Sequence, residues 1–315
     1  KGTKKKATVE LNSTATFDKQ ATKFKDIQKI YGQGINGALP DDPVSSQSSI
    51  FSNWGPRLDP KVMVIGFDGV ERPYALADQS LDAFLQTGKS FSNSISVSQA
   101  VGKSSYRLAY TNLNTNDIVP KTGLDRHSFN LGNTIAINDH LSVTSRIVYM
   151  YEKMNNRLAL GDAYNNIAKS FFGLANNIDP AIFGQNYKTP EGEYIEWGGG
   201  QWNYNPYWVV NDMKNTTNKN RFLGGLTINY NFAKYCSLQL MGSADQNSLN
   251  FEEYSPATTP RALTGALVQN ESKIITLQGD AMLSFEKDLS DDINISARAG
   301  LNYYDFRDEG FNNTY

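Results

Sequence analysis

The sequence has 315 residues, enough for one large domain or two of ordinary size. Its 30 Lys and Arg residues against 32 Asp and Glu residues leave a net charge of −2, which argues against a nucleic-acid binder with a basic face. Hydrophobic residues make up 39%. No run approaches the ~20 apolar residues of a membrane-spanning helix, so a helical membrane bundle is excluded.

Cysteine and histidine are too scarce for several kinds of site. Cys236 is the one cysteine, so no internal disulfide and no zinc cluster can form. His127 and His140 make no metal site without help from carboxylates, and we expect neither a metal nor a cofactor. The chain starts at Lys1 with no signal pattern, so we expect that an exported protein would lack its beginning here.

The strongest periodicity along the chain is two, which predicts β-strands with one apolar and one polar face. In residues 7–17, Val9 and Leu11 fall on one side, and Glu10 and Asn12 fall on the other. Such a run of eleven residues fits the ~9 to 11 residues of a tilted membrane-spanning strand. Nine strands are predicted in this way, at 7–17, 91–98, 104–113, 126–137, 141–151, 221–232, 236–244, 273–286 and 293–304.

The connections between these strands are short and long in strict alternation. Tight turns are predicted at 99–103, 138–140, 233–235 and 287–292, and the long segments are 18–90, 112–125, 152–220 and 245–272. All tight turns then lie at one end of an antiparallel sheet, and the long loops lie at the other end. This arrangement is typical of an outer-membrane barrel with short periplasmic turns and long extracellular loops. Alternation alone also fits a soluble β-sandwich.

The last two predicted strands have the cleanest alternation and give an explicit prediction for each face. A barrel that holds a plug is apolar outside and polar inside. The side chains expected to face lipid are Leu277, Leu283, Phe285, Ile293, Ile295 and Leu301. Those expected to face the lumen are Gln278, Asp280, Glu286, Asn294, Arg298 and Asn302.

Aromatic residues crowd into the predicted loop 152–220, beside amide side chains and a run of three glycines. Flat rings stack on apolar ligand faces while amides bond polar edges, so this composition suits a sugar or an extended peptide. The proposed ligand-binding residues are Trp197, Trp202, Tyr204, Asn205, Tyr207 and Trp208. The alternative is a loop that packs on itself or against a partner subunit.

Motifs for catalysis and nucleotide binding are weak. Residues 32–37 match G-x-G-x-x-G, but no buried strand precedes them and Pro40 and Pro43 interrupt the chain just after them. Glu191, Glu193 and Glu196 lie in a Gly-rich loop, where solvated carboxylates are more common than a hydrolytic pair. We therefore predict that the protein is not an enzyme, with a glycoside hydrolase kept as a minor alternative.

Several sequence words resemble a known family. They are residues 31–34 (YGQG), 53–59 (NWGPRLD), 82–88 (DAFLQTG), 104–112 (SSYRLAYTN), 117–120 (DIVP), 205–208 (NPYW) and 220–222 (NRF). In this order they resemble SusC/RagA-type TonB-dependent outer-membrane transporters of Bacteroidetes. The resemblance implies an all-β fold, with residues 1–6 as the tail of the plug domain. Residues 7–315 would then be the N-terminal part of the barrel, about nine of its 22 transmembrane strands, with long extracellular loops at 18–90, 152–220 and 245–272.

The resemblance also implies a function and partners. These transporters lie in the cell outer membrane, in contact with its lipid, and import an oligosaccharide or oligopeptide. They work with a SusD-like surface lipoprotein and are driven by the TonB complex, which would contact segments absent from this sequence. The alternative from another class is a soluble secreted β-rich module that binds glycans or acts as an adhesin.

Overall fold

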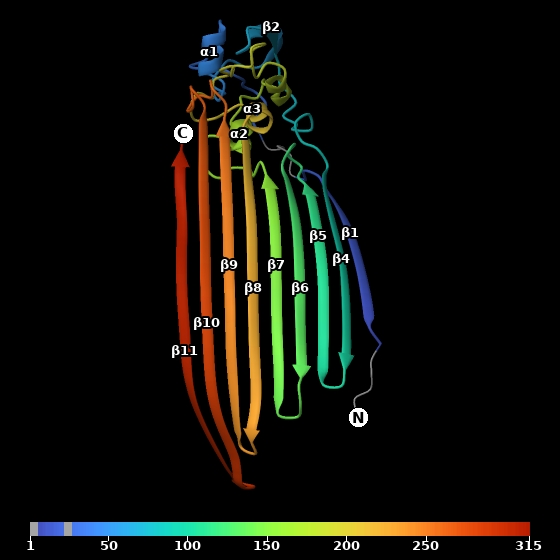
Figure 1. Cartoon of the computed structure of the whole chain (residues 1–315). Helices are drawn as coiled ribbons and strands as arrows, with labels where there is room; N and C mark the ends of the chain where they lie inside the picture. Colours follow the sequence, from blue (N-terminus) through green and yellow to red (C-terminus); the bar gives the residue numbers. More distant parts are fainter. Residues whose placement is uncertain (1–5, 22–26) are drawn as a thin grey trace.

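A computed structural model describes residues 6–21 and 27–315 (Figure 1). Nine antiparallel strands form one sheet in the order β1-β4-β5-β6-β7-β8-β9-β10-β11, and β2 and β3 form a separate hairpin. The strands of the sheet are β1 (Thr8–Asp18), β4 (Gly88–Val101), β5 (Ser104–Asn116), β6 (Gly123–Ala136), β7 (Leu141–Asn155), β8 (Lys214–Ala233), β9 (Cys236–Ser255), β10 (Ala266–Ser290) and β11 (Ile293–Thr314).

The remaining elements are short and lie in the connections. The hairpin consists of β2 (Asp59–Ile65) and β3 (Glu71–Tyr74). The helices are α1 (Pro43–Ser48), α2 (Ile167–Phe172), α3 (Pro206–Asn211) and the 3₁₀ helix η1 (Pro180–Gly184). Within residues 6–21 and 27–315, none of these helices has the length and hydropathy needed to cross a membrane.

Tight turns all lie at one end of the sheet, and the longer connections lie at the other (Figure 1). The tight turns are 102–103, 137–140, 234–235 and 291–292. Gly102 adopts φ 61°, a conformation that L side chains rarely take, in the first of these turns. The opposite connections are 19–87, 117–122, 156–213 and 256–265. The predicted alternation of turn lengths is therefore present, with one connection of only six residues.

Two predicted loops are much shorter in the structure because their flanking strands continue. The predicted loop 245–272 is reduced to 256–265, since β9 runs to Ser255 and β10 begins at Ala266. The segment 112–125 is reduced to 117–122. The continuing halves are polar on the face of the apolar rows, as at Asn218, Asn250 and Glu252, while Leu249 and Phe251 lie on the opposite face. The outward apolar alternation that marks the other strand segments therefore stops there. The proposed plug tail, residues 1–6, lies outside the described residues except for Lys6.

The register separates the sheet into an apolar and a polar face. Partners directly opposite on neighbouring strands share a face. One row across β1 and β4–β7 is fully apolar, and it consists of Val9, Val97, Leu108, Leu131 and Ile147. The adjacent row on the other face contains Ser98, Arg107, Gly132 and Arg146. In β10 and β11, Leu283 pairs with Ala299 on the apolar face, and Asp280 pairs with Asn302 on the polar face.

The apolar face is a band with aromatic margins rather than a full-length stripe. In β8 it covers residues 222–232, and the next outward positions are Asn220, Asn218 and Thr216. One margin contains the Tyr110, Phe129 and Tyr149 rings, with centroids 4.7 and 6.5 Å apart along the row. The other margin contains ring pairs near the tight turns, namely Tyr230 with Phe232 and Tyr235 with Phe285. The four longest strands, of 20 to 25 residues, therefore divide into an apolar half and a polar half.

No described segment covers this band. Leu283 is 48% exposed and Leu301 is 80% exposed. The buried hydrophobic residues instead gather beyond the strand ends, where the long connections meet (Figure 1). They include Ile50, Phe84, Phe171 and Trp197, which come from the connections 19–87 and 156–213. The molecule thus has its hydrophobic core in the loops and an uncovered apolar surface on the sheet.

Candidate functional site

The long connections pack into one body, which we call the loop cap and define as residues 27–87, 156–213 and 256–265. Side-chain caps begin its short helices. Asp42 accepts a hydrogen bond from the Ser45 amide at the start of α1, and Asn205 does the same for the Tyr207 amide at the start of α3. Proline occupies the first turn of α1, η1 and α3, where its missing N–H costs nothing. These local signals explain why long segments with little alternation are nevertheless ordered.

The six residues proposed to bind ligand do not form one exposed surface. Trp197, Tyr204, Asn205 and Trp208 are buried, Tyr207 is partly buried, and only Trp202 is largely exposed, at 59%. Their rings pack on one another, since the Trp208 and Tyr194 centroids lie 5.3 Å apart and the Trp197 and Phe183 centroids lie 4.8 Å apart. For the four buried residues, the structure agrees with the alternative interpretation of the sequence, in which the loop packs on itself.

Polar contacts fix the connection 256–265 to this aromatic core. The Trp208 indole N–H donates to the Thr259 hydroxyl at 3.1 Å, and the Tyr194 amide donates to the Thr258 hydroxyl at 2.8 Å. Burial raises the pKa of the Tyr204 phenol to about 12 and raises that of Tyr194 further. Both phenols therefore stay neutral and serve as hydrogen-bonding parts of the core.

Glu196 has a structural role that its sequence context did not reveal. One of its carboxylate oxygens accepts hydrogen bonds from the backbone amides of Trp197, Gly198 and Gly200, at 3.1, 2.7 and 2.9 Å. Gly198 and Gly200 have positive φ, which turns their amides toward the carboxylate. Glu191 and Glu193 are exposed in the neighbouring turn. In residues 32–37, the Gly34 and Gly37 amides donate to the carbonyls of other loop residues and form no phosphate cradle.

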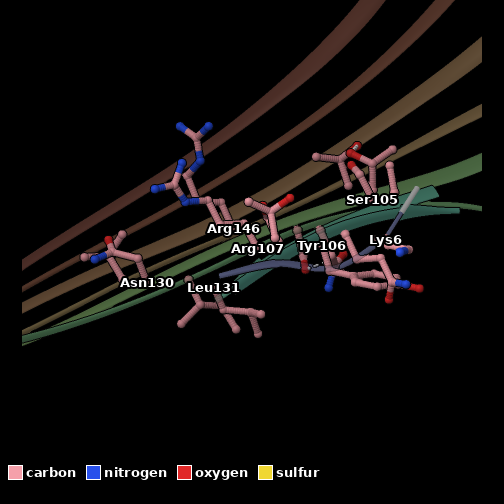
Figure 2. Close-up of a pocket in the computed structure, with 18 residues that line it drawn as sticks. Lys6, Ser105, Tyr106, Arg107, Asn130, Leu131 and Arg146 are labelled. Carbon is pink, nitrogen blue, oxygen red and sulfur yellow. Dashed lines mark hydrogen bonds between the residues drawn. The ribbon is translucent and has the colours of Figure 1, made fainter. Parts of the chain in front are cut away.

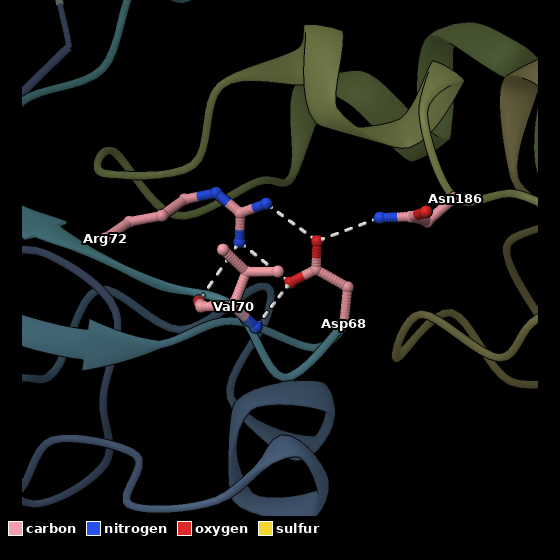
Figure 3. Close-up of polar contacts among 4 residues, drawn as sticks. All are labelled: Asp68, Val70, Arg72 and Asn186. Atoms are coloured by element: carbon pink, nitrogen blue, oxygen red, sulfur yellow. Dashed lines mark hydrogen bonds and ion pairs between the residues drawn. The ribbon is translucent and has the colours of Figure 1, made fainter.

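An ion pair closes the hairpin β2–β3, and a hydrogen bond from Asn186 joins its carboxylate to the connection 156–213 (Figure 3). The Asp68 side chain is 3% exposed and receives two hydrogen bonds of 2.7 Å from the Arg72 guanidinium. Asn186 donates a third, at 3.3 Å, from the other segment. Burial alone would raise the pKa of Asp68, but the hydrogen bonds from Arg72, the Val70 amide and Asn186 outweigh it and lower that pKa.

The polar face of the sheet contains a hollow of about 540 Å³. Arg107 and Arg146 project from one side of the strands and Leu131 from the other (Figure 2). Glu10 lies 3.6 Å from the Arg107 guanidinium. Within residues 6–21 and 27–315, no cluster of three or more His, Cys, Asp or Glu side chains is suited to a metal. The hollow therefore presents polar and cationic groups on the face opposite the apolar band.

Comparison with known proteins identifies the fold. No family model and no curated protein matches the sequence. The chain is similar to the solved structure of the RagAB peptide importer in the "closed-closed" state, with a TM-score of 0.69, 13% identity and coverage of 98% of this chain and 36% of that chain. The RagAB peptide transporter matches with a TM-score of 0.67 and 12% identity, over 97% of this chain and 35% of that chain. The importer in the "open-open" state matches with a TM-score of 0.62 and 11% identity, over 99% of this chain and 36% of that chain.

These matches bear on the fold at low sequence identity. The chain spans about a third of the length of the chains it matches. The predicted fold class is confirmed, because the described chain is a nine-stranded antiparallel sheet that is not closed and corresponds to part of such a transporter. The fold thus supports the resemblance to SusC/RagA-type transporters that the short sequence motifs indicated.

We expect Asp68→Asn to loosen the hairpin from the rest of the loop cap. The variant leaves the Arg72 guanidinium without its carboxylate, at a cost of about 2 kcal/mol. Hydrogen exchange of residues 60–75 should accelerate markedly. The pKa of Asp68 is lower in the folded protein than in the unfolded chain. Its contribution to the free energy of unfolding is therefore complete above about pH 4, and it is lost as the pH falls through the pKa of the folded state. Glu71→Gln, an exposed position in the same hairpin, is the matched control. Equal exchange in both variants would contradict this role.

Proposed function

We propose that the chain is the N-terminal part of the barrel of a SusC/RagA-type importer, located in a Gram-negative outer membrane and driven by TonB. The observation that carries the proposal is the uncovered apolar band with aromatic residues at both margins. Lipid is the natural cover for such a surface, because exposing it to water is costly. The structural likeness to the RagAB peptide importer supports the same function.

The dimensions of the band support a membrane location. Residues 222–232 of β8 are eleven residues long. At ~3.3 Å per residue and a tilt near 40°, they span roughly 27 Å, close to the ~25 Å apolar height of outer-membrane barrels. The ring pairs at both margins correspond to the aromatic girdles of such barrels. A soluble glycan-binding or adhesin module is disfavoured, since it would need other protein to cover the band.

The loop cap and the tight turns suggest the orientation. Outer-membrane barrels have short periplasmic turns and long extracellular loops. We therefore assign the loop cap to the cell surface, where a SusD-like lipoprotein would cover it, and the turns at 102–103 and 234–235 to the periplasm. TonB would act through parts of the protein outside this sequence. The named neighbour imports peptides, which favours an oligopeptide substrate over an oligosaccharide.

We expect Leu283→Lys to impair folding of the complete importer in lipid. The substitution places a charge on the apolar face, two residues inside the margin at Phe285, where the cost is smaller than the roughly 2 to 4 kcal/mol of the bilayer midplane. Ser284→Lys, one position along β10 on the polar face, is the control and should cost little. Equilibrium unfolding by guanidinium in lipid vesicles compares the two. A Leu283→Lys variant as stable as Ser284→Lys would overturn the lipid assignment.

We expect Leu160→Cys to react with a membrane-impermeant maleimide on whole cells, since Leu160 is exposed on the loop cap. Asp139→Cys, in the turn between β6 and β7, should react only after the outer membrane is permeabilised. Both are made with Cys236→Ser to remove the native thiol. Labelling of Asp139→Cys alone on intact cells would reverse the proposed orientation.

A further inference from the structure

One aromatic cluster of the loop cap lies at the edge of its hydrophobic core and reaches the solvent. The Arg261 guanidinium lies over two rings, 5.0 Å from the Tyr164 centroid and 5.4 Å from the Trp202 centroid. Tyr164 packs on buried Tyr204 with 4.9 Å between centroids. Arg261 and Trp202 are both exposed, so this cluster presents a cation and a flat ring to the solvent.

Both exposed groups are held in place by backbone contacts. The loop that contains Arg261 is fixed through the neighbouring Thr259, whose hydroxyl accepts a hydrogen bond from the Trp208 indole and donates one to the Pro256 carbonyl. Lys169 donates to the Trp202 carbonyl at 3.2 Å and forms an ion pair of 2.6 Å with Asp162. The orientation of the cluster is therefore fixed before any ligand arrives, which lowers the entropic cost of binding.

The Arg261 guanidinium keeps its charge available. Among the described residues no carboxylate forms an ion pair with it, in contrast to Arg72, Arg126 and Arg221. Glu253, at the outer end of β9, lies near Tyr164 and Tyr204, but it is partly buried and makes no ion pair with Arg261. Stacking on rings uses the face of a guanidinium and leaves its N–H donors free at the edge.

We propose that Arg261, with Trp202 and Tyr164, binds a carboxylate of the imported peptide. The guanidinium edge offers two parallel N–H donors to the carboxylate, and the indole provides an apolar surface for the adjoining chain. This inference rests on the proposed function, and it narrows the substrate class to peptides with acidic side chains or a free C-terminus near the site.

The test measures binding of labelled peptides to the complete importer, purified with its lipoprotein partner. One pentapeptide ends in two glutamates with a free carboxyl group, and the matched peptide ends in two glutamines with an amide. The wild type should bind the acidic peptide about tenfold more tightly. Arg261→Met should bind both peptides alike, with unchanged affinity for the neutral one. Arg157→Met, at another exposed arginine of the loop cap, should keep the wild-type preference, and Arg261→Lys should recover part of it.

The other outcomes distinguish a failure of this inference from a failure of the proposed function. Equal affinity of the wild type for both peptides would overturn the carboxylate site and leave peptide import standing. Binding of a trigalacturonate that Arg261→Met abolishes, without binding of either peptide, would keep the carboxylate chemistry and overturn the peptide substrate. Absence of binding by all three probes would overturn both.

Discussion

An apolar sheet face that no described segment covers is the constraint on which the rest of this structure depends. A soluble protein buries such a face against another layer, and here the hydrophobic residues available for a second layer gather beyond the strand ends instead. The band ends where Tyr110, Phe129 and Tyr149 give way to polar outward positions. This boundary supports the proposed contact with lipid, because a bilayer would limit the apolar side chains to a band such as residues 222–232 of β8.

The polar halves of the strands connect this band to the loop cap. They carry the sheet beyond the apolar region and bring the connections 19–87, 156–213 and 256–265 together at a common level. The cap then folds around its own core, fixed by the Trp208–Thr259 hydrogen bond and by the Asn186–Asp68 hydrogen bond to the hairpin β2–β3. Because the core is internal to the loops, the cap can present an ordered surface such as Arg261 and Trp202 without support from the barrel interior.

Periodicity in the sequence predicted the features that repeat, namely the strands, their two faces and the end at which the turns lie. Periodicity did not predict the strand segments in which the apolar alternation stops. Asn218 and Asn250 lie in the outer halves of β8 and β9, where the face of the apolar band has become polar, so the extent of β8, β9 and β10 could not be read from hydropathy. Composition also misassigned Trp197 and Trp208, because a ring that completes a core and a ring that stacks on a ligand have the same identity. Only tertiary contacts distinguish them, as they also do for Glu196 and its three backbone donors.

The central claim is that one face of the sheet meets lipid over a limited band. Spin labels placed singly along residues 271–286 of β10 in the complete importer, reconstituted in lipid vesicles, test it through collision with oxygen and with a water-soluble nickel chelate. The account predicts that oxygen contact alternates with a period of two, with maxima at 277, 281, 283 and 285, and that this preference disappears at 271 and 273. Uniform contact with the nickel chelate at the odd positions 277–285 would contradict it.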